Sequence, residues 1–300
     1  MYEEISRNKR RTFLLLLFFV VLVAGAAVAV DLLLVGSYIL IPVAIVIAIA
    51  MAWASYFYSD RIALAASRAR PADGPEYRRY HNLVEGLCIA AGLPKPRLYV
   101  VDDPAPNAFA TGRNPKHAAL AVTTGLLQMM NRVELEGVIA HELAHVKNYD
   151  ILVGTVAVTA VGALALIADI GLRMMWFGGG RRRGNNSGGG LGGLIGLLAL
   201  VFLILAPFVA QLMQFAMSRN RELLADASGV KLTRYPPGLI SALEKLKGDH
   251  AVVHHATRAT AQLWIESPLD RDTEHKHTRL NRAFNTHPPL DERIQILKEM

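Results

Sequence analysis

Cysteine and charge are both scarce in this chain of 300 residues. Cys88 is the single cysteine, so no internal disulfide can form, which suits a reducing compartment. Charged residues make up only 19% of the sequence and hydrophobic residues 52%, which excludes the composition of an ordinary soluble protein. The sequence contains no motif for nucleic-acid binding, and we predict no nucleic-acid partner. Much of the net charge of +7 lies beside apolar segments, where anionic lipid is the natural counterpart.

Charged residues are missing from two long apolar runs near the N-terminus, residues 13–30 and residues 32–57. A helix of about 20 apolar residues crosses the roughly 30 Å hydrocarbon core of a bilayer. We therefore predict a transmembrane hairpin over residues 13–58. The alternative is a cleaved signal peptide, whose apolar region spans about 7–15 residues. The first run is longer than that, and the second follows directly after Asp31.

Lys and Arg are absent between the two runs but occur on both outer flanks. Lys9, Arg10 and Arg11 precede the first run, and Arg61 and Arg68 follow the second. Cytoplasmic flanks of membrane helices are enriched in Lys and Arg. The sequence therefore predicts that residues 1–12 form a cytoplasmic N-terminus and that the chain returns to the cytoplasm after the hairpin.

A second hydrophobic hairpin is predicted over residues 151–217, with a loop rich in Gly and Arg at 178–193. If both of its helices cross the bilayer, Arg181, Arg182 and Arg183 lie outside, against the usual bias of basic residues toward the cytoplasm. Two alternatives remain. The hairpin crosses the bilayer despite its arginines, or its helices enter the bilayer only in part.

Polar sequence occurs in two pieces, residues 59–150 and residues 218–300, which we expect to build one domain. The expected fold class is an α-helical membrane protein with an α+β domain, mostly α with a small sheet. In the first piece, residue patterns predict a helix at 74–92, strands at 96–103 and 117–125 around a turn-rich stretch, and one helix at 126–149. In the second piece, helices are predicted at 217–232, at 240–249 and at the C-terminus.

The stretch HELAH contains His141 and His145 four residues apart, with Glu142 after the first. On a helix this spacing puts both imidazoles on one face. A zinc hydrolase typically uses three protein ligands and keeps a fourth position for water, and the H-E-x-x-H pattern supplies two ligands and a general base. We therefore predict one Zn²⁺ per chain, bound by His141 and His145, with Glu142 as the base. The alternative is a pair of histidines in a core or on a surface, without a metal.

A third ligand should come from the other polar piece, where Glu222 and Asp226 lie one helical turn apart. We predict Glu222 as the third zinc ligand and Asp226 as a carboxylate that accepts the free ring N–H of a zinc-bound histidine. The alternative is a solvated charged helix in which Arg219 or Arg221 lies between the two carboxylates. Asp150, directly after the histidine helix, is expected to cap the junction with the next apolar run.

The chain resembles the HtpX family of membrane zinc metallopeptidases. Four stretches carry this resemblance and occur in the order found in that family: NAFATG, HELAHVKNYD, SRNRELLADASG and THPPLDERI. Members of the family are relatives of the type I CAAX prenyl endopeptidases. The resemblance implies a gluzincin-type catalytic domain that faces the cytoplasm, in a multi-pass protein of the cell (inner) membrane. It implies polypeptide substrates, specifically damaged or misassembled membrane proteins. It also implies zinc binding by His141, His145 and Glu222, with Glu142 as base and Asp226 as an orienting aspartate.

The same resemblance implies two further roles. NAFATG would be an edge strand that pairs with an extended substrate, with Asn107, Ala108 and Phe109 as substrate-binding residues; the alternative is an ordinary turn followed by a strand. His287 and Arg293 would stabilise the oxyanion formed during attack, a task that suits an imidazolium or a guanidinium. The alternative is that Arg293 caps or salt-bridges the C-terminal helix and that His287 merely precedes a Pro-Pro turn.

Three functions compete. The first is a membrane-anchored zinc endopeptidase in quality control of membrane proteins. The second is an intramembrane protease with its metal inside the bilayer, which the charged residues Glu134, Glu136, Lys147 and Asp150 around the motif disfavour. The third is a non-catalytic membrane scaffold that retains the metal fold. No oligomeric state is predicted.

Overall fold

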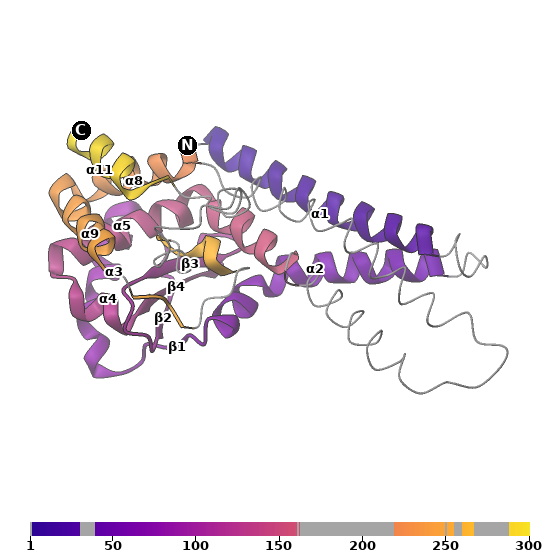
Figure 1. Cartoon of the computed structure of the whole chain (residues 1–300), viewed down its shortest axis with the longest axis horizontal. Coiled ribbons are helices and arrows are strands. Elements are labelled where there is room, and N and C mark those ends of the chain that lie inside the picture. The colour runs from indigo at the N-terminus through magenta and orange to yellow at the C-terminus, as the bar shows by residue number, and fades with distance from the viewer. Residues whose placement is uncertain are drawn as a thin grey trace, which may run out of the picture.

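The computed structural model describes residues 2–30, 40–160, 162, 219–249, 251–254, 260–266 and 288–300. The predicted loop at 178–193, most of the second hydrophobic hairpin (residue 161 and residues 163–217) and His287 lie outside these residues. The described chain forms a mostly helical domain around a small sheet, and a pair of long helices projects from it (Figure 1).

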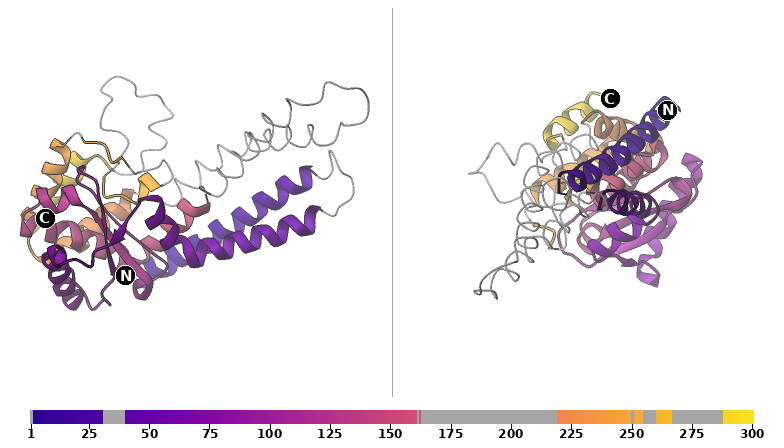
Figure 2. Two further views of the ribbon diagram at one scale, coloured as in Figure 1. Left: turned by 90° about the horizontal axis from the view of Figure 1, so that it is seen from below. Right: turned by 90° about the vertical axis from the view of Figure 1, so that its right-hand side faces the viewer.

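The projecting helices are α1 (Tyr2–Val30) and α2 (Leu40–Ala66), which lie side by side in two perpendicular views (Figures 1 and 2). Within the described residues, one helix, Ile41–Ala66, is long and apolar enough to cross a membrane, by length and composition alone. Helix α1 carries exposed apolar side chains as well, such as Phe13 and Val21. The short apolar helix Asp150–Ala160 is buried, because it packs against α1 and α2 at their base.

The sheet has four strands: β1 (Arg70–Pro71), β2 (Arg97–Val101), β3 (Ala108–Gly112) and β4 (Ala118–Thr123), in the order β1-β2-β4-β3. Strands β2 and β4 are parallel, whereas β1 and β3 pair with their neighbours antiparallel. The predicted strands at 96–103 and 117–125 correspond to β2 and β4. The turn-rich stretch between them contains β3, an edge strand whose five residues are all buried.

The helix predicted at 74–92 begins later than expected, as α3 (Arg78–Ala91), and ends at Gly92 in the left-handed conformation. The prediction of one helix over 126–149 is wrong. The chain forms α4 (Thr124–Met129), becomes extended at Met130 and Asn131, and then forms α5 (Arg132–Asn148). Asn131 causes the break, because its side chain accepts hydrogen bonds from the first turn of α5 and its own N–H donates to Glu134, a capping box.

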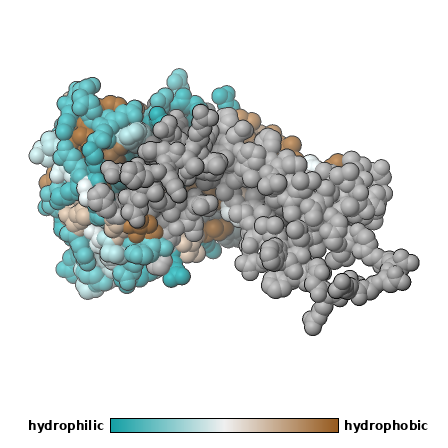
Figure 3. Space-filling model, in the orientation of Figure 1, coloured by the Kyte–Doolittle hydropathy of each residue, from teal (hydrophilic) through white to brown (hydrophobic). Residues whose placement is uncertain are grey.

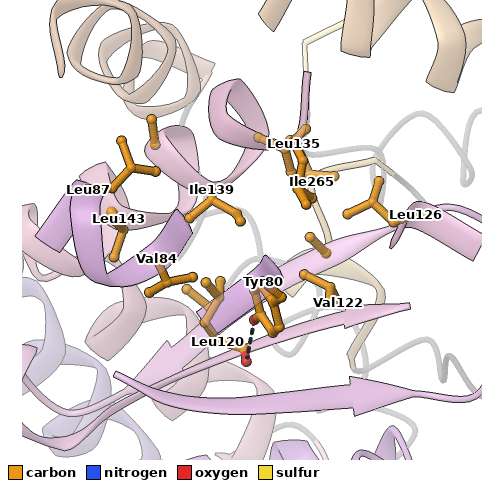
Figure 4. Packing of buried hydrophobic residues seen from close by; sticks show 14 of the residues in the cluster. Tyr80, Val84, Leu87, Leu120, Val122, Leu126, Leu135, Ile139, Leu143 and Ile265 are labelled. Atoms are coloured by element: carbon orange, nitrogen blue, oxygen red, sulfur yellow. Dashed lines mark hydrogen bonds between the residues drawn. The ribbon is translucent and has the colours of Figure 1, made fainter. Parts of the chain in front are cut away.

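The described residues of the second polar piece include the helices α8 (Arg219–Thr233), α9 (Pro236–Gly248) and α11 (Leu290–Lys298). The short helix η4 (Thr260–Leu263) leads into a segment beside β3. The core lies between the sheet and helices α3 and α5, where apolar side chains from both layers meet (Figure 4). Tyr80 crosses this core, and its hydroxyl donates to the Leu120 carbonyl at 3.1 Å.

Candidate metal centre

Helix α5 carries the H-E-x-x-H residues in the interior of the domain. It is held at its start by the Asn131 capping box and ends at Tyr149, which adopts a left-handed conformation with φ of 62°. Its neighbours are β3 on one side and α8 and α9 on the other. His141 and Glu142 are therefore almost completely shielded from solvent, and His145 is only slightly exposed.

Three donor groups meet beside α5. The Nε2 atoms of His141 and His145 are 3.2 Å apart, and Glu222 of α8 places one carboxylate oxygen 3.6 Å from the first and the other 3.5 Å from the second. The structure thus brings together the two histidines of one polar piece and the glutamate of the other. All three candidate ligand atoms lie within 4.8 Å of one another.

These spacings match what a metal needs. Zinc holds nitrogen and oxygen ligands at about 2.0–2.2 Å, so neighbouring ligand atoms of a tetrahedral ion lie about 3.3–3.6 Å apart. Two imidazoles and one carboxylate also form a donor set typical of zinc hydrolases. The residues present therefore fit a zinc ion, with Nε2 of both histidines as the inward-facing atoms.

The outer nitrogen of His141 contacts Asp226, whose Oδ1 is 2.8 Å from Nδ1. Arg293 of α11 holds the same carboxylate in a bidentate pair, with Nη2 donating to Oδ1 at 2.7 Å and Nε donating to Oδ2 at 2.8 Å. Burial alone would raise the pKa of Asp226, but the charges of Arg293 and His141 lower it to about 2. Asp226 is therefore an anion that keeps the Nδ1–H of His141 outward and frees Nε2.

The outer nitrogen of His145 contacts a different carboxylate, Asp150, at 3.2 Å. Sequence reasoning assigned Asp150 only to the junction after the histidine helix. Since Tyr149 turns the chain with a positive φ, Asp150 folds back toward the ring of His145. Each candidate histidine ligand thus has one buried carboxylate behind it.

Arg293 lies behind His141, away from the inward-facing nitrogens. The guanidinium is completely buried, pairs with Asp226, and donates through Nη1 to the Ile265 carbonyl at 3.1 Å. Its Nη1 is 3.9 Å from a Glu222 oxygen. The pKa of Arg293 is raised, because although burial opposes its charge, Asp226 and Glu222 stabilise it more. His287, its predicted partner at the oxyanion, lies outside the described residues.

Burial and charge set the protonation of the central residues. Burial raises the pKa of Glu142 to about 7, although His145 and a hydrogen bond from the Ala110 backbone act in the opposite direction. Burial would lower the pKa of His145, but Glu222 and Asp150 raise it to about 9. The pKa of His141 is lowered, chiefly by burial. Glu142 can therefore exchange a proton near neutral pH.

The outer edge of β3 is already occupied by residues 260–266 of the chain itself. The Ile265 N–H donates to the Ala108 carbonyl at 2.9 Å, and the Trp264 and Phe109 rings pack edge to face with centroids 4.6 Å apart. The Asn107 side chain donates to the Glu266 carbonyl at 3.0 Å. All three predicted substrate-binding residues therefore contact this segment.

A cavity of about 40 Å³ adjoins the inward-facing nitrogens. Its walls include Glu142, Asp150 and Glu222, Ala110 of β3, and residues 262–265. A cavity needs about 10–15 Å³ for each water molecule, so this one has room for a metal and a water.

Comparisons with known proteins show the family of this chain. The profile of Peptidase family M48 matches residues 76–300. A protein named "Protease HtpX homolog" from Streptococcus uberis is 43% identical over 302 residues, covering 100% of both chains. A protein of the same name from Tropheryma whipplei (strain Twist) is 45% identical over 300 residues, covering 100% of this chain and 98% of its own.

Among solved structures, the crystal structure of S. mikatae Ste24p is similar at 19% sequence identity and a TM-score of 0.48. The match covers 84% of this chain and 57% of that one. The resemblance inferred from the four sequence stretches is confirmed by the full-length relatives and by the family profile: the chain belongs to peptidase family M48, among proteins named protease HtpX homologs.

Proposed function

We propose that the protein is a membrane-anchored zinc endopeptidase that cuts polypeptides on the cytoplasmic side of the cell membrane. One observation carries this proposal. His141 and His145 from one polar piece and Glu222 from the other converge with ligand-like spacings, beside the carboxylate of Glu142. Membership of family M48 supports peptidase chemistry, and the buried donor set supports zinc as the metal.

The roles of the residues follow from their positions. His141, His145 and Glu222 would hold the ion, while Asp226 and Asp150 keep the two imidazoles in the required tautomer and orientation. When bound, zinc acts as a Lewis acid and lowers the pKa of a coordinated water toward 7. Glu142 lies next to this position and accepts a proton at its carboxylate, then delivers it to the leaving amine.

The pKa of Glu142 decides the pH range of this step. Its value of about 7 is set mainly by burial. A bound dication favours the carboxylate and lowers that pKa, so Glu142 is ready to act as a base at neutral pH. The active form is deprotonated, and we therefore expect kcat/KM to fall on acidification below neutral pH.

We propose a positioning role for Arg293 beside the oxyanion role that the resemblance implies. Its donors bond to Asp226 and to the Ile265 carbonyl, and its Nη1 lies 3.9 Å from Glu222. We assign it to holding Asp226, and through Asp226 the ring of His141. The same contact with Ile265 ties α11 to the segment that covers β3.

The substrate is an extended polypeptide that pairs with β3, which requires Ile265 to leave the Ala108 carbonyl. The groups that hold Ile265 and Glu266 now, at Asn107 and Ala108, are those that a substrate backbone would use. Pairing along an edge strand recognises the backbone and tolerates many side chains. This tolerance suits quality control of damaged or misassembled membrane proteins.

The exposed apolar surface of the hairpin supports membrane anchoring. Side chains on α1 and α2 such as Leu14, Val46, Ile49 and Trp53 are more than half exposed. Hydrophilic residues cover much of the domain surface, and hydrophobic ones appear along the edge where α1 projects (Figure 3). Lys9 lies over the Tyr149 ring, so the basic start of α1 is next to the end of the metal helix. This contact supports a metal centre at headgroup level and disfavours the intramembrane alternative.

The full-length chain, purified in detergent, provides the test. We expect about one zinc per chain, casein cleavage that stops with a chelator and returns with zinc, and loss of at least roughly 100-fold in Glu142→Gln. Glu142→Gln should keep its zinc. Glu136→Gln is the matched control, because it makes the same change on α5 outside the site.

Two results would change the proposal. Cleavage retained in Glu142→Gln removes the assigned base. Zinc bound by a wild-type chain that cleaves neither casein nor a membrane protein favours the scaffold alternative instead.

A further inference from the structure

One polar side chain of the membrane hairpin is buried against the catalytic domain. Asn8 is completely shielded from solvent, although its neighbours Arg7, Lys9 and Arg10 on α1 are exposed. Its Nδ2 donates to Asp150 Oδ1 at 2.7 Å and to the Asn148 carbonyl at 2.9 Å. A buried amide is costly unless it is hydrogen-bonded, so this one marks a specific contact.

Asp150 connects Asn8 to a histidine of the metal centre. Asp150 uses Oδ2 for His145 Nδ1 and Oδ1 for Asn8. Asp226 also joins a histidine to a second partner, since its Oδ1 contacts His141 and Arg293 binds both of its oxygens. One carboxylate is thus held by the C-terminal helix α11, and the other by the N-terminal helix α1.

Helix α1 is seated firmly enough to set the position of Asn8. Leu15 packs against Val153 and Ala157, and Phe19 packs against Ala52 and Ala160. Val153, Ala157 and Ala160 belong to the helix that begins at Asp150, whereas Ala52 belongs to α2. Asn8, Leu15 and Phe19 therefore attach α1 to the chain directly after the metal helix, at spacings of one face of α1.

We propose that Asn8 is a positioning residue of the metal centre and that α1 is part of this centre as well as an anchor. By donating to Asp150 Oδ1, Asn8 fixes the carboxylate so that Oδ2 meets His145 Nδ1, which aims Nε2 of His145 at the metal. The inference rests on the proposed function, in which His145 binds zinc.

The alternative is that Asn8 only anchors α1 to the domain. Asn8 would then tie α1 to the Asn148 carbonyl, and its loss would loosen the hairpin without affecting His145. Arg221, with Nε 3.9 Å from Asp150 Oδ1, would hold the carboxylate by charge. The two views differ in whether the effect of Asn8 on the metal passes through Asp150.

Zinc affinity of the full-length chain, measured by competition with a chelator, distinguishes them. Loss of an outer partner of a metal ligand typically costs 10–100-fold in affinity. Because Arg221 remains near Asp150, we expect about a tenfold loss in Asn8→Ala, at the lower end of that range. Thr12→Val is the matched control: Thr12 is buried one turn further along α1 and bonds only to the Asn8 carbonyl among the hydrogen bonds of the described chain. It should bind zinc like wild type.

Cobalt substitution adds a readout that does not depend on activity. The visible spectrum of bound Co²⁺ reports ligand geometry, and we expect it to change in Asn8→Ala and to stay unchanged in Thr12→Val. If Asn8→Ala does not yield folded protein, Asn8→Ser takes its place, because it keeps a donor and removes less volume; a severalfold loss is then expected.

A double-mutant cycle with Asp150→Ala gives the decisive result. If Asn8 acts through Asp150, adding Asn8→Ala to Asp150→Ala changes zinc affinity by less than about twofold. Equal losses from Asn8→Ala in both backgrounds would overturn the proposal, as would wild-type affinity and spectrum in Asn8→Ala. Absence of zinc in the wild-type chain is a separate outcome, which refutes the proposed function itself.

Discussion

Gly229 of α8 lies directly against the backbone of α5 at His141. A Cβ added there would lie 3.0 Å from the His141 backbone nitrogen and 3.2 Å from the His141 Cα. Ordinary contacts of a Cβ are 3.4–4 Å, and the atoms that it would meet belong to the backbone of α5. Gly229→Ala therefore forces α8 and α5 apart by a few tenths of an ångström, an overpacking that costs about 1–3 kcal/mol.

The displacement acts directly on the third ligand. Glu222 lies two helical turns before Gly229 on the same face of α8, so it moves away from the histidines with the helix. Metal–ligand distances tolerate only about 0.2 Å, less than this movement. We expect Gly229→Ala to fold with reduced stability and to lose about 10–100-fold in zinc affinity, as when a partner of a metal ligand is removed.

The assay pairs chelator competition with thermal unfolding followed by circular dichroism. Gly86→Ala on α3 is the control, because a Cβ there meets nothing within 4 Å. Alanine is favoured over glycine in a helix by about 0.5–1 kcal/mol, so this variant should be slightly more stable and bind zinc normally. A folded Gly229→Ala protein with wild-type zinc affinity would refute the reasoning that helix spacing sets the ligand distance.

Three further outcomes test the site. Glu222→Ala should lose zinc in metal analysis far more completely than Asp226→Ala, because it removes a ligand rather than a partner of one; equal metal content in Glu222→Ala and wild type would refute its role. The lowered pKa of Asp226, about 2, stabilises the fold above pH 4, and about 2 kcal/mol is lost as the pH falls from 4 toward 2. Denaturant unfolding should show this loss in wild type but not in Asp226→Asn. Trp264→Ala should lower KM for an extended peptide and leave zinc bound, because it weakens the segment that covers β3; an unchanged or higher KM argues against displacement of that segment.

Structure was predicted most accurately from the sequence where a residue type has a single structural role. Gly92 ends a helix because it adopts a left-handed conformation, and the position of this end was predicted. The H-E-x-x-H spacing likewise predicted that His141 and His145 share one face of a helix, because this depends only on local helix geometry. Glu222 could be predicted as their partner, although residues 151–217 separate it from the histidines, because zinc requires a third protein ligand.

Prediction from the sequence failed where two local signals compete, or where a contact joins residues that are far apart in the sequence. Asn131 lies inside a pattern that reads as continuous helix, yet its capping box with Glu134 breaks the helix in two. Asp150 lies five residues after His145, and nothing local indicates that Tyr149 turns the chain back. The contact of Asn8 with Asp150 joins residues 142 apart in sequence, and that of Ile265 with Ala108 also depends on tertiary packing.

The two carboxylates behind the histidines explain why such distant contacts gather here. A buried carboxylate needs hydrogen-bond donors or a cation besides the histidine that it orients. Asn8 near the start of the chain and Arg293 near its end supply the missing donors. Both terminal helices must therefore dock before both imidazoles are correctly aimed, so zinc binding reports on assembly of the whole chain. A chain with a detached hairpin should keep His141 in place through Asp226 and lose the orientation of His145 alone, which leaves a metal site that is weakened rather than abolished.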